Sequence, residues 1–98
     1  MLIQKNPLTI GEKVILRLLT GEEVIGIVES STADEVVLTK PFRLQAMQGG
    51  PGLMPFSLIG SQDHPFHFQM KQIVAIYNLD SAFEPDYIQA STGISIVR

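Results

Sequence analysis

Residues 21–28 read Gly-Glu-Glu-Val-Ile-Gly-Ile-Val, with two glycines five positions apart among alternating apolar side chains. The period of two predicts a β-strand, and Thr20-Gly21-Glu22 supplies the turn from a preceding strand over residues 13–19. Gly26 falls in the middle of the second strand, where a glycine usually marks a sharp bend or a close backbone approach. We therefore expect a strongly bent strand, as in a small barrel.

Both faces of these two predicted strands are largely apolar. A lone antiparallel sheet normally keeps one polar face in water. The second apolar face therefore needs cover from a helix, a closed barrel or another subunit. The side chains on that face are Ile15, Leu19, Ile25 and Ile27.

Alternation continues along most of the remaining chain. Pro41 and Pro55 lack the N–H that a central strand needs, so they mark edges or bulges. The glycine-rich residues 49–52 indicate a flexible break, and the change of phase at Lys71-Gln72 indicates either a bend or a very tight turn between two strands. The further predicted strands span residues 35–40 with a continuation over 42–47, 53–59, 66–71 and 73–79.

Two short helices are expected at the ends of the chain. Asn6-Pro7 is typical of a helix start that Gly11 ends, and Pro85 with Gly93 brackets a helix over residues 85–92. The apolar strip of residues 94–97 is of a kind that pairs with a sheet edge, in its own subunit or in a neighbour. We divide the chain into a barrel over residues 1–80 and an extension over residues 81–98.

Composition excludes several classes of protein. The 98 residues fit one small domain, and 45% apolar with 17% charged residues exclude an intrinsically disordered chain. No run approaches the roughly 18 apolar residues of a membrane span, and no signal peptide is expected. Because there is no cysteine, disulfides and thiolate chemistry are excluded, which fits a reducing compartment. We expect a soluble, cytoplasmic protein.

The glycine pattern of residues 21–28 resembles the first motif of the Sm/LSm family of RNA-associated ring proteins. That motif has a turn glycine, two variable residues, an apolar residue, a mid-strand glycine and another apolar residue, and the strand order extends the likeness over residues 6–79. The Thr-Gly-Glu-Glu-Val turn, the Lys40-Pro41 step and the closing Ser-Thr-Gly-Ile also look like Sm-like proteins of marine cyanophages.

This resemblance implies an all-β fold: a five-stranded, strongly bent Sm-like (SH3-like) barrel with a short N-terminal and a short C-terminal helix. It also implies a homo-oligomeric ring, in which the fourth strand of one subunit pairs with the fifth strand of the next. Such pairing would also cover the second apolar face described above.

The resemblance further implies where a nucleic acid would bind. In that family an Asp and an Asn after the second strand and an Arg-Gly before the last strand contact RNA near the pore. Here Asp34 stands near the first position without a following Asn, and Lys71-Gln72 replaces Arg-Gly. Lys40 and Arg43 are further candidates for phosphate contacts, because basic side chains position nucleic-acid backbones.

Two functions remain open on this basis. The favoured one is a non-catalytic ring that binds nucleic acid, single-stranded RNA or DNA, in RNA or DNA processing during phage infection. The net charge of −3, from 7 basic and 10 acidic residues, opposes it, because phosphate binding depends on clustered Lys and Arg. The alternative is a structural or adaptor ring that binds protein partners. We expect neither a membrane nor a small-molecule substrate as partner.

No residue group in the sequence makes a persuasive catalytic or metal site. His64 and His67 would point to opposite faces of an extended chain, and with Asp63 they lack a further strong donor. A catalytic triad through these histidines and Asp63 or Asp80 lacks the Gly-x-Ser-x-Gly elbow. Residues 49–52 lack the Lys-Ser/Thr of a phosphate loop. We therefore expect no enzyme, no metal and no cofactor.

Four phenylalanines allow two interpretations. Aromatic side chains stack on bases in other small barrels. Alternation with polar neighbours, however, predicts that most of them belong to the core. These residues are Phe42, Phe56, Phe66 and Phe68.

Overall fold

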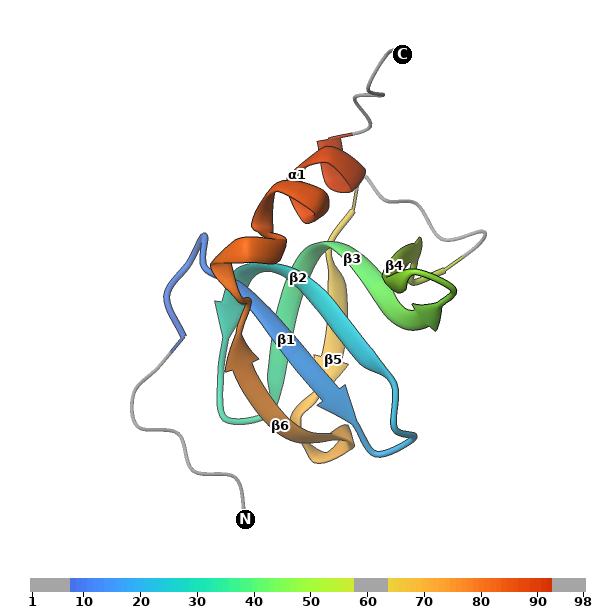
Figure 1. Cartoon of the computed structure of the whole chain (residues 1–98). Helices are drawn as coiled ribbons and strands as arrows, with labels where there is room; N and C mark the ends of the chain where they lie inside the picture. Colours follow the sequence, from blue (N-terminus) through green and yellow to red (C-terminus); the bar gives the residue numbers. More distant parts are fainter. Residues whose placement is uncertain (1–7, 58–63, 93–98) are drawn as a thin grey trace.

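Six antiparallel strands form one sheet that curls around a hydrophobic interior, with a single α-helix over one end (Figure 1). The structure is a computed structural model that describes residues 8–57 and 64–92, and these counts refer to them. The strands are β1 (Lys13–Leu18), β2 (Glu23–Ser31), β3 (Glu35–Met47), β4 (Gly50–Pro55), β5 (Phe66–Gln69) and β6 (Ile73–Asn78). The short 3₁₀ helices η1 (Met70–Gln72) and η2 (Ser81–Phe83) precede β6 and the helix α1 (Glu84–Thr92).

The strands lie in the order β4-β3-β2-β1-β6, and β5 pairs with the other half of β3. Residues 42–47 of β3 pair with β4, and residues 35–38 pair with β5, so β4 and β5 together occupy the place of one strand. The expected count of five strands was therefore one short, because this place is divided between two short strands. Of the two readings of the phase slip at Lys71-Gln72, the tight turn is correct, since η1 joins β5 to β6.

The glycine-rich stretch is more ordered than its composition suggested. Gly50 is opposite Met47, so the chain reverses through the two residues Gln48 and Gly49. Gly49 and Gly50 have φ of 129° and 130°, which side chains rarely adopt. The predicted flexible break over residues 49–52 is thus a hairpin turn followed by the start of β4, because pairing with β3 orders the glycines.

β2 and β3 bend together at Gly26. The register shifts between Ile25 and Ile27, so that Lys40 and Pro41 both stand opposite this glycine. Such a two-to-one bulge bends the strand and increases its twist. Lys40 takes the left-handed conformation, with φ of 50°. The predicted strong bend is present.

Gly26 also permits a close approach between the two strands. A Cβ atom at this position would lie 2.8 Å from Cδ1 and 3.0 Å from Cβ of Leu38, which is fully buried. Any side chain at residue 26 would therefore force β2 and β3 apart.

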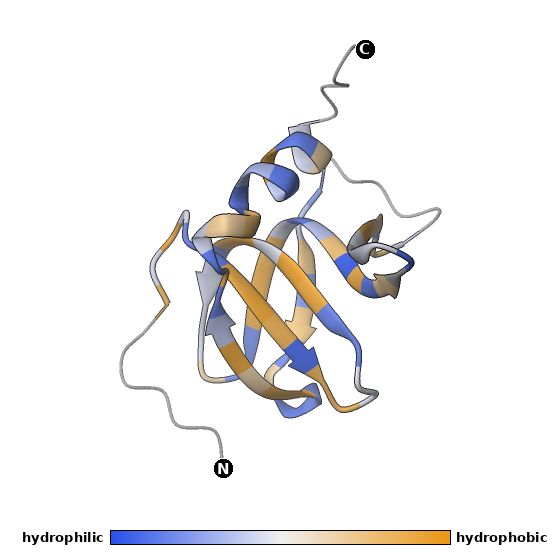
Figure 2. Ribbon diagram, in the orientation of Figure 1, coloured by the Kyte–Doolittle hydropathy of each residue, from blue (hydrophilic) through white to orange (hydrophobic). Residues whose placement is uncertain are grey.

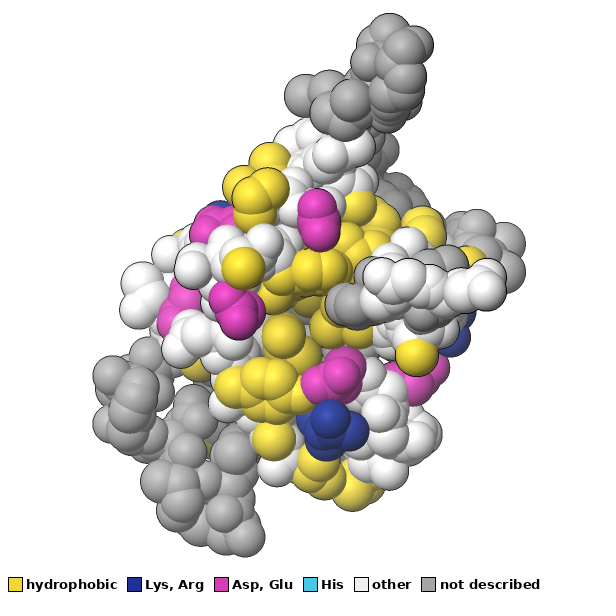
Figure 3. All heavy atoms as spheres, in the orientation of Figure 1, with side chains coloured by type: hydrophobic (Ala, Val, Ile, Leu, Met, Phe, Trp, Pro, Cys, Tyr) yellow, Lys and Arg dark blue, Asp and Glu magenta, His cyan; other side chains and the backbone are white. Residues whose placement is uncertain are grey.

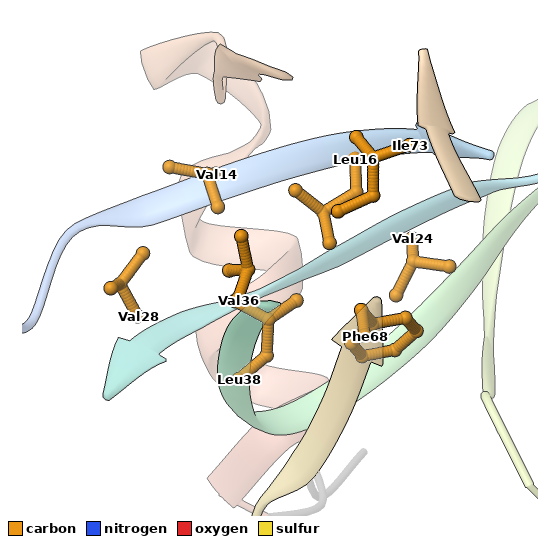
Figure 4. Close-up of a cluster of buried hydrophobic side chains, with 8 residues drawn as sticks. All are labelled: Val14, Leu16, Val24, Val28, Val36, Leu38, Phe68 and Ile73. Atoms are coloured by element: carbon orange, nitrogen blue, oxygen red, sulfur yellow. The ribbon is translucent and has the colours of Figure 1, made fainter. Parts of the chain in front are cut away.

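The inner face of the curled sheet holds the main core. Figure 2 shows hydrophobic residues concentrated along the strands. Figure 4 shows side chains of five strands pointing toward one another in the space that the sheet encloses. We call this set the inner cluster; it consists of Val14, Leu16, Val24, Val28, Val36, Leu38, Phe68 and Ile73.

The opposite face of β1 and β2 is covered by α1. Tyr87 of the helix is fully buried there and contacts Phe42 edge-on, with ring centroids 6.0 Å apart. Its hydroxyl donates to the carbonyl of Lys40 at 2.8 Å, which fixes the helix on the β3 bulge. We call this second set the outer cluster; its buried members are Ile15, Ile25, Phe42 and Tyr87, with Ile27, Leu44, Leu53, Leu79 and Ala90 packed against them.

The outer cluster decides how the second apolar face is covered. A helix, a barrel and a subunit contact were all open from the sequence, and the helix α1 covers Ile15, Ile25 and Ile27. The idea that a ring contact accounts for this apolar face is therefore wrong for these residues. Leu19 remains 60% exposed.

The helix predictions have different outcomes. The C-terminal helix over 85–92 is confirmed as α1, one residue longer at its start. Where the described chain overlaps the expected N-terminal helix, Ile10 and Gly11 form a turn instead, with Gly11 bonded to the carbonyl of Val28 at 2.8 Å. Asn6-Pro7 and the strip 94–97 lie outside the described residues. No helix in the described part of the chain is long and apolar enough to cross a membrane.

Candidate nucleic-acid interface

Asp34 and Lys71, two of the four predicted contact residues, lie together at one end of the sheet. Asp34 ends the loop between β2 and β3, and Lys71 is in η1. The backbone N–H of Met70 donates to the carbonyl of Asp34 at 2.7 Å and holds these two segments together. They border an open hollow of about 560 Å³, lined by Ala33, Asp34, Gln69, Met70 and Lys71.

The loop that carries Asp34 is held by its own hydrogen bonds. The Thr32 hydroxyl accepts from the N–H groups of Asp34 and Glu35 at 3.1 and 3.2 Å. The N–H of Thr32 donates to the carbonyl of Glu35 at 2.9 Å. This local turn leaves the Asp34 side chain exposed at the rim of the hollow. Sequence reasoning missed Thr32, although a threonine two residues before an aspartate is a recognisable turn signal.

The side chains at the rim are available to a ligand. Both Asp34 and Lys71 are exposed. Among the described residues, neither the Asp34 carboxylate nor the Lys71 ammonium has a hydrogen-bond or ion-pair partner. The hollow thus offers one cation and one hydrogen-bond acceptor side by side.

Lys40 and Arg43 lie further along β3, and neither lines this hollow. Lys40 is at the bulge, where its carbonyl accepts from Tyr87. A guanidinium nitrogen of Arg43 lies 3.5 Å from a carboxylate oxygen of Glu22, and its Nε is buried without a partner in the described part of the protein. The four candidates therefore do not form one continuous basic surface.

Acidic partners neutralise most of the basic side chains in the described residues. Lys13 pairs with Glu84 at 2.9 Å, and Arg17 pairs with Glu23 at 3.2 Å. Basic atoms visible in Figure 3 accordingly lie next to acidic ones. With Arg43 also paired, the unpaired cations of residues 8–57 and 64–92 are Lys40 and Lys71. Lys5 and Arg98 lie outside these ranges.

The histidines do not assemble a metal site in the described residues. His67 Nδ1 lies 3.2 Å from an oxygen of Glu35, and His64 is exposed. No three histidine, cysteine or acidic side chains of the described chain are grouped closely enough to hold a metal ion. Asp63 lies outside the described residues.

The phenylalanines pack against other aromatic rings. Phe56 contacts Phe66 and Phe68 edge-on, with centroids 6.1 and 5.3 Å apart, and Phe42 contacts Tyr87. Phe42 and Phe68 are buried. The core interpretation is therefore confirmed for these two residues.

Comparisons with known proteins support the fold. No family model and no curated protein matches the sequence. Among solved structures, the chain is similar to a heptameric archaeal Sm protein, with 15% identity and a TM-score of 0.51. The similarity covers 72% of this chain and 90% of that protein. The likeness to cyanophage proteins stays a prediction, whereas the arrangement of the strands shows that this chain has an Sm-like fold.

Proposed function

We propose that this protein is a non-catalytic, ring-forming protein that binds single-stranded nucleic acid, RNA foremost, in RNA or DNA processing. The observation that carries the proposal is the meeting of Asp34 and Lys71 in one hollow, although they come from separate loops. These are the two loop positions at which the Sm resemblance implies RNA contacts.

Free strand edges support the ring. Among the described strands, β6 pairs only with β1, and β4 and β5 pair only with β3. Each free edge leaves backbone N–H and C=O groups that favour pairing with another strand. A contact between the β4–β5 edge of one subunit and the β6 edge of the next is head-to-tail, and it gives a closed ring if the rotation closes. The solved structural neighbour is itself heptameric.

The chemistry of the hollow suits weak contacts that a ring repeats. The Lys71 ammonium would neutralise a phosphate, and the Asp34 carboxylate would accept a hydrogen bond from a base or a ribose hydroxyl. One cation per subunit binds weakly, and the net charge of −3 opposes binding. A ring places several copies along one strand, so that their contributions multiply through effective concentration.

Two measurements test the proposal separately. Light scattering after gel filtration in physiological salt is expected to give a discrete multiple of the chain mass, and a clean monomer would remove the ring. Fluorescence anisotropy with a labelled single-stranded RNA is expected to show affinity that falls steeply with salt.

Variants of equal charge locate the binding site. Lys71→Gln removes the cation of the hollow and is expected to weaken binding and flatten its salt dependence, since fewer counterions are released. Lys13→Gln is the matched control, because it removes an ion-paired lysine that does not line the hollow. Undetectable or salt-independent binding, or equal effects of the two variants, would count against the proposed site.

The alternative, an adaptor ring for protein partners, is favoured by the neutralisation of most basic side chains. Deleting the chain after Asp80 does not distinguish the two functions, because it removes α1 and uncovers the outer cluster. Point variants that leave both clusters intact are needed instead.

A further inference from the structure

An apolar groove of about 610 Å³ lies on the outer face of the sheet, beside η2 and the β3–β4 hairpin (Figure 3). Ile15 and Leu44, both of the outer cluster, contribute to its lining, together with Ala46 of the hairpin. Leu79 and Phe83 line it on the side of η2. α1 therefore covers only part of this face, and the groove is the part that it leaves open.

The charged side chains that line this groove, within the described chain, are the acids Glu23 and Asp80. Glu23 Oε2 accepts from the Arg17 guanidinium at 3.2 Å and from the Tyr77 hydroxyl. Asp80 Oδ1 accepts from the N–H of Ala82 at 2.9 Å. One oxygen of each carboxylate thus remains without a partner among the described residues. An apolar surface next to two such oxygens is complementary to apolar side chains that flank a cation.

The groove is separate from the hollow at Asp34 and Lys71, with which it shares no lining residue. Two carboxylates would repel a phosphate backbone, so a nucleic acid is a poor occupant. The volume falls within the roughly 300–1,000 Å³ of ligand sites, which suits a few side chains of a short segment.

We propose that this groove binds a peptide segment of a partner protein, in which apolar side chains flank an arginine or a lysine. The apolar side chains cover Ile15, Leu44 and Phe83, and the cation is placed between Glu23 and Asp80. This site is independent of the proposed nucleic-acid function and gives the ring a second kind of ligand.

Calorimetric titration of the full chain tests the site with a defined probe. The probe is the acetylated and amidated peptide Leu-Thr-Leu-Arg-Leu-Thr, and its control carries Glu in place of Arg. Saturable binding of the arginine peptide is expected below about 1 mM, with at least a tenfold (~10-fold) loss for the control peptide. No saturable binding of the arginine peptide, or equal binding of both peptides, would overturn the proposal.

Variants of the chain locate the contact. Ala46→Lys places a cation in the groove at an exposed position and is expected to weaken binding about tenfold or more. Gln48→Lys makes a similar charge change two residues along, at an exposed position that does not line the groove, and is expected to have little effect. Asp80→Asn removes one charge while an amide oxygen can still cap η2, so binding should also weaken.

A further variant separates this proposal from the nucleic-acid function. Lys71→Gln is expected to leave peptide binding unchanged. Peptide binding that Ala46→Lys and Gln48→Lys affect equally would place the contact elsewhere and refute the groove, whatever the RNA measurements show.

Discussion

Replacing Gly26 with alanine tests the close approach that bends this sheet. The new Cβ would lie 2.8 Å from Cδ1 and 3.0 Å from Cβ of Leu38. Because Leu38 is fully buried in the inner cluster, its side chain has no space into which it can move. Overpacking of this kind costs about 1–3 kcal/mol. Alanine also restricts the unfolded chain, which returns about 0.4–1 kcal/mol. We expect a net loss of about 1–2 kcal/mol in the free energy of unfolding.

Urea unfolding followed by circular dichroism measures this loss. With a slope of about 1–3 kcal/mol per molar urea, the midpoint should fall by roughly 1 M. All variants must be compared at one protein concentration, because ring formation stabilises the folded chain by mass action. Ser30→Ala, at an exposed position of the same strand, is the control and should stay within about 0.5 kcal/mol of the original chain.

A double-mutant cycle assigns the loss to Leu38. Leu38→Ala removes the atoms at 2.8 and 3.3 Å and leaves only the contact at 3.0 Å. Gly26→Ala should therefore cost less in that background, with a coupling energy of at least about 0.5 kcal/mol. A Gly26→Ala variant as stable as the original chain, or an absence of coupling, would refute the steric explanation of the bend.

Three further predictions follow from the outer cluster and the turns. Tyr87→Phe leaves the Lys40 carbonyl without the hydroxyl that lies 2.8 Å away and should cost about 1–3 kcal/mol in urea unfolding. Burial raises the pKa of Tyr87, so the stability that this residue provides is complete below about pH 10, where unfolded tyrosine titrates, and declines above it; a pH series of melting curves should show a smaller alkaline loss in Tyr87→Phe, and an unchanged loss would contradict the assignment. Gly21→Ala forces a side chain into φ of 96° and should cost about 1–2 kcal/mol by the same urea assay, although nothing lies within 4 Å of the added Cβ.

The local pattern of the sequence predicted most of the elements. Alternation placed the strands, and Pro85 with Gly93 placed α1 to within one residue. The predicted N-terminal helix failed in its described part, because Gly11 takes φ of 91° and bonds to Val28 of β2. A tertiary hydrogen bond there outweighs a local capping signal, which periodicity does not report.

The candidate site was predictable only in part. Asp34 and Lys71 were chosen by resemblance, and their meeting depends on the hydrogen bond from Met70 to the Asp34 carbonyl. That Arg43 is paired with Glu22 could not be read from the chain, because its partner lies on the turn before a neighbouring strand. Charge counts alone treated all basic residues as equally free.

The sequence by itself determined that the protein is built of short strands, that β2 bends at Gly26 and that the second face of the sheet needs cover. These properties follow from local periodicity and from the backbone freedom of one residue. Only the tertiary structure decided what provides the cover and where an apolar groove remains. The packing of Tyr87 on the β3 bulge joins residues that lie far apart in the chain. A choice between a helix and a neighbouring subunit depends on which apolar surface reaches the sheet, and alternation along one strand carries no information about that.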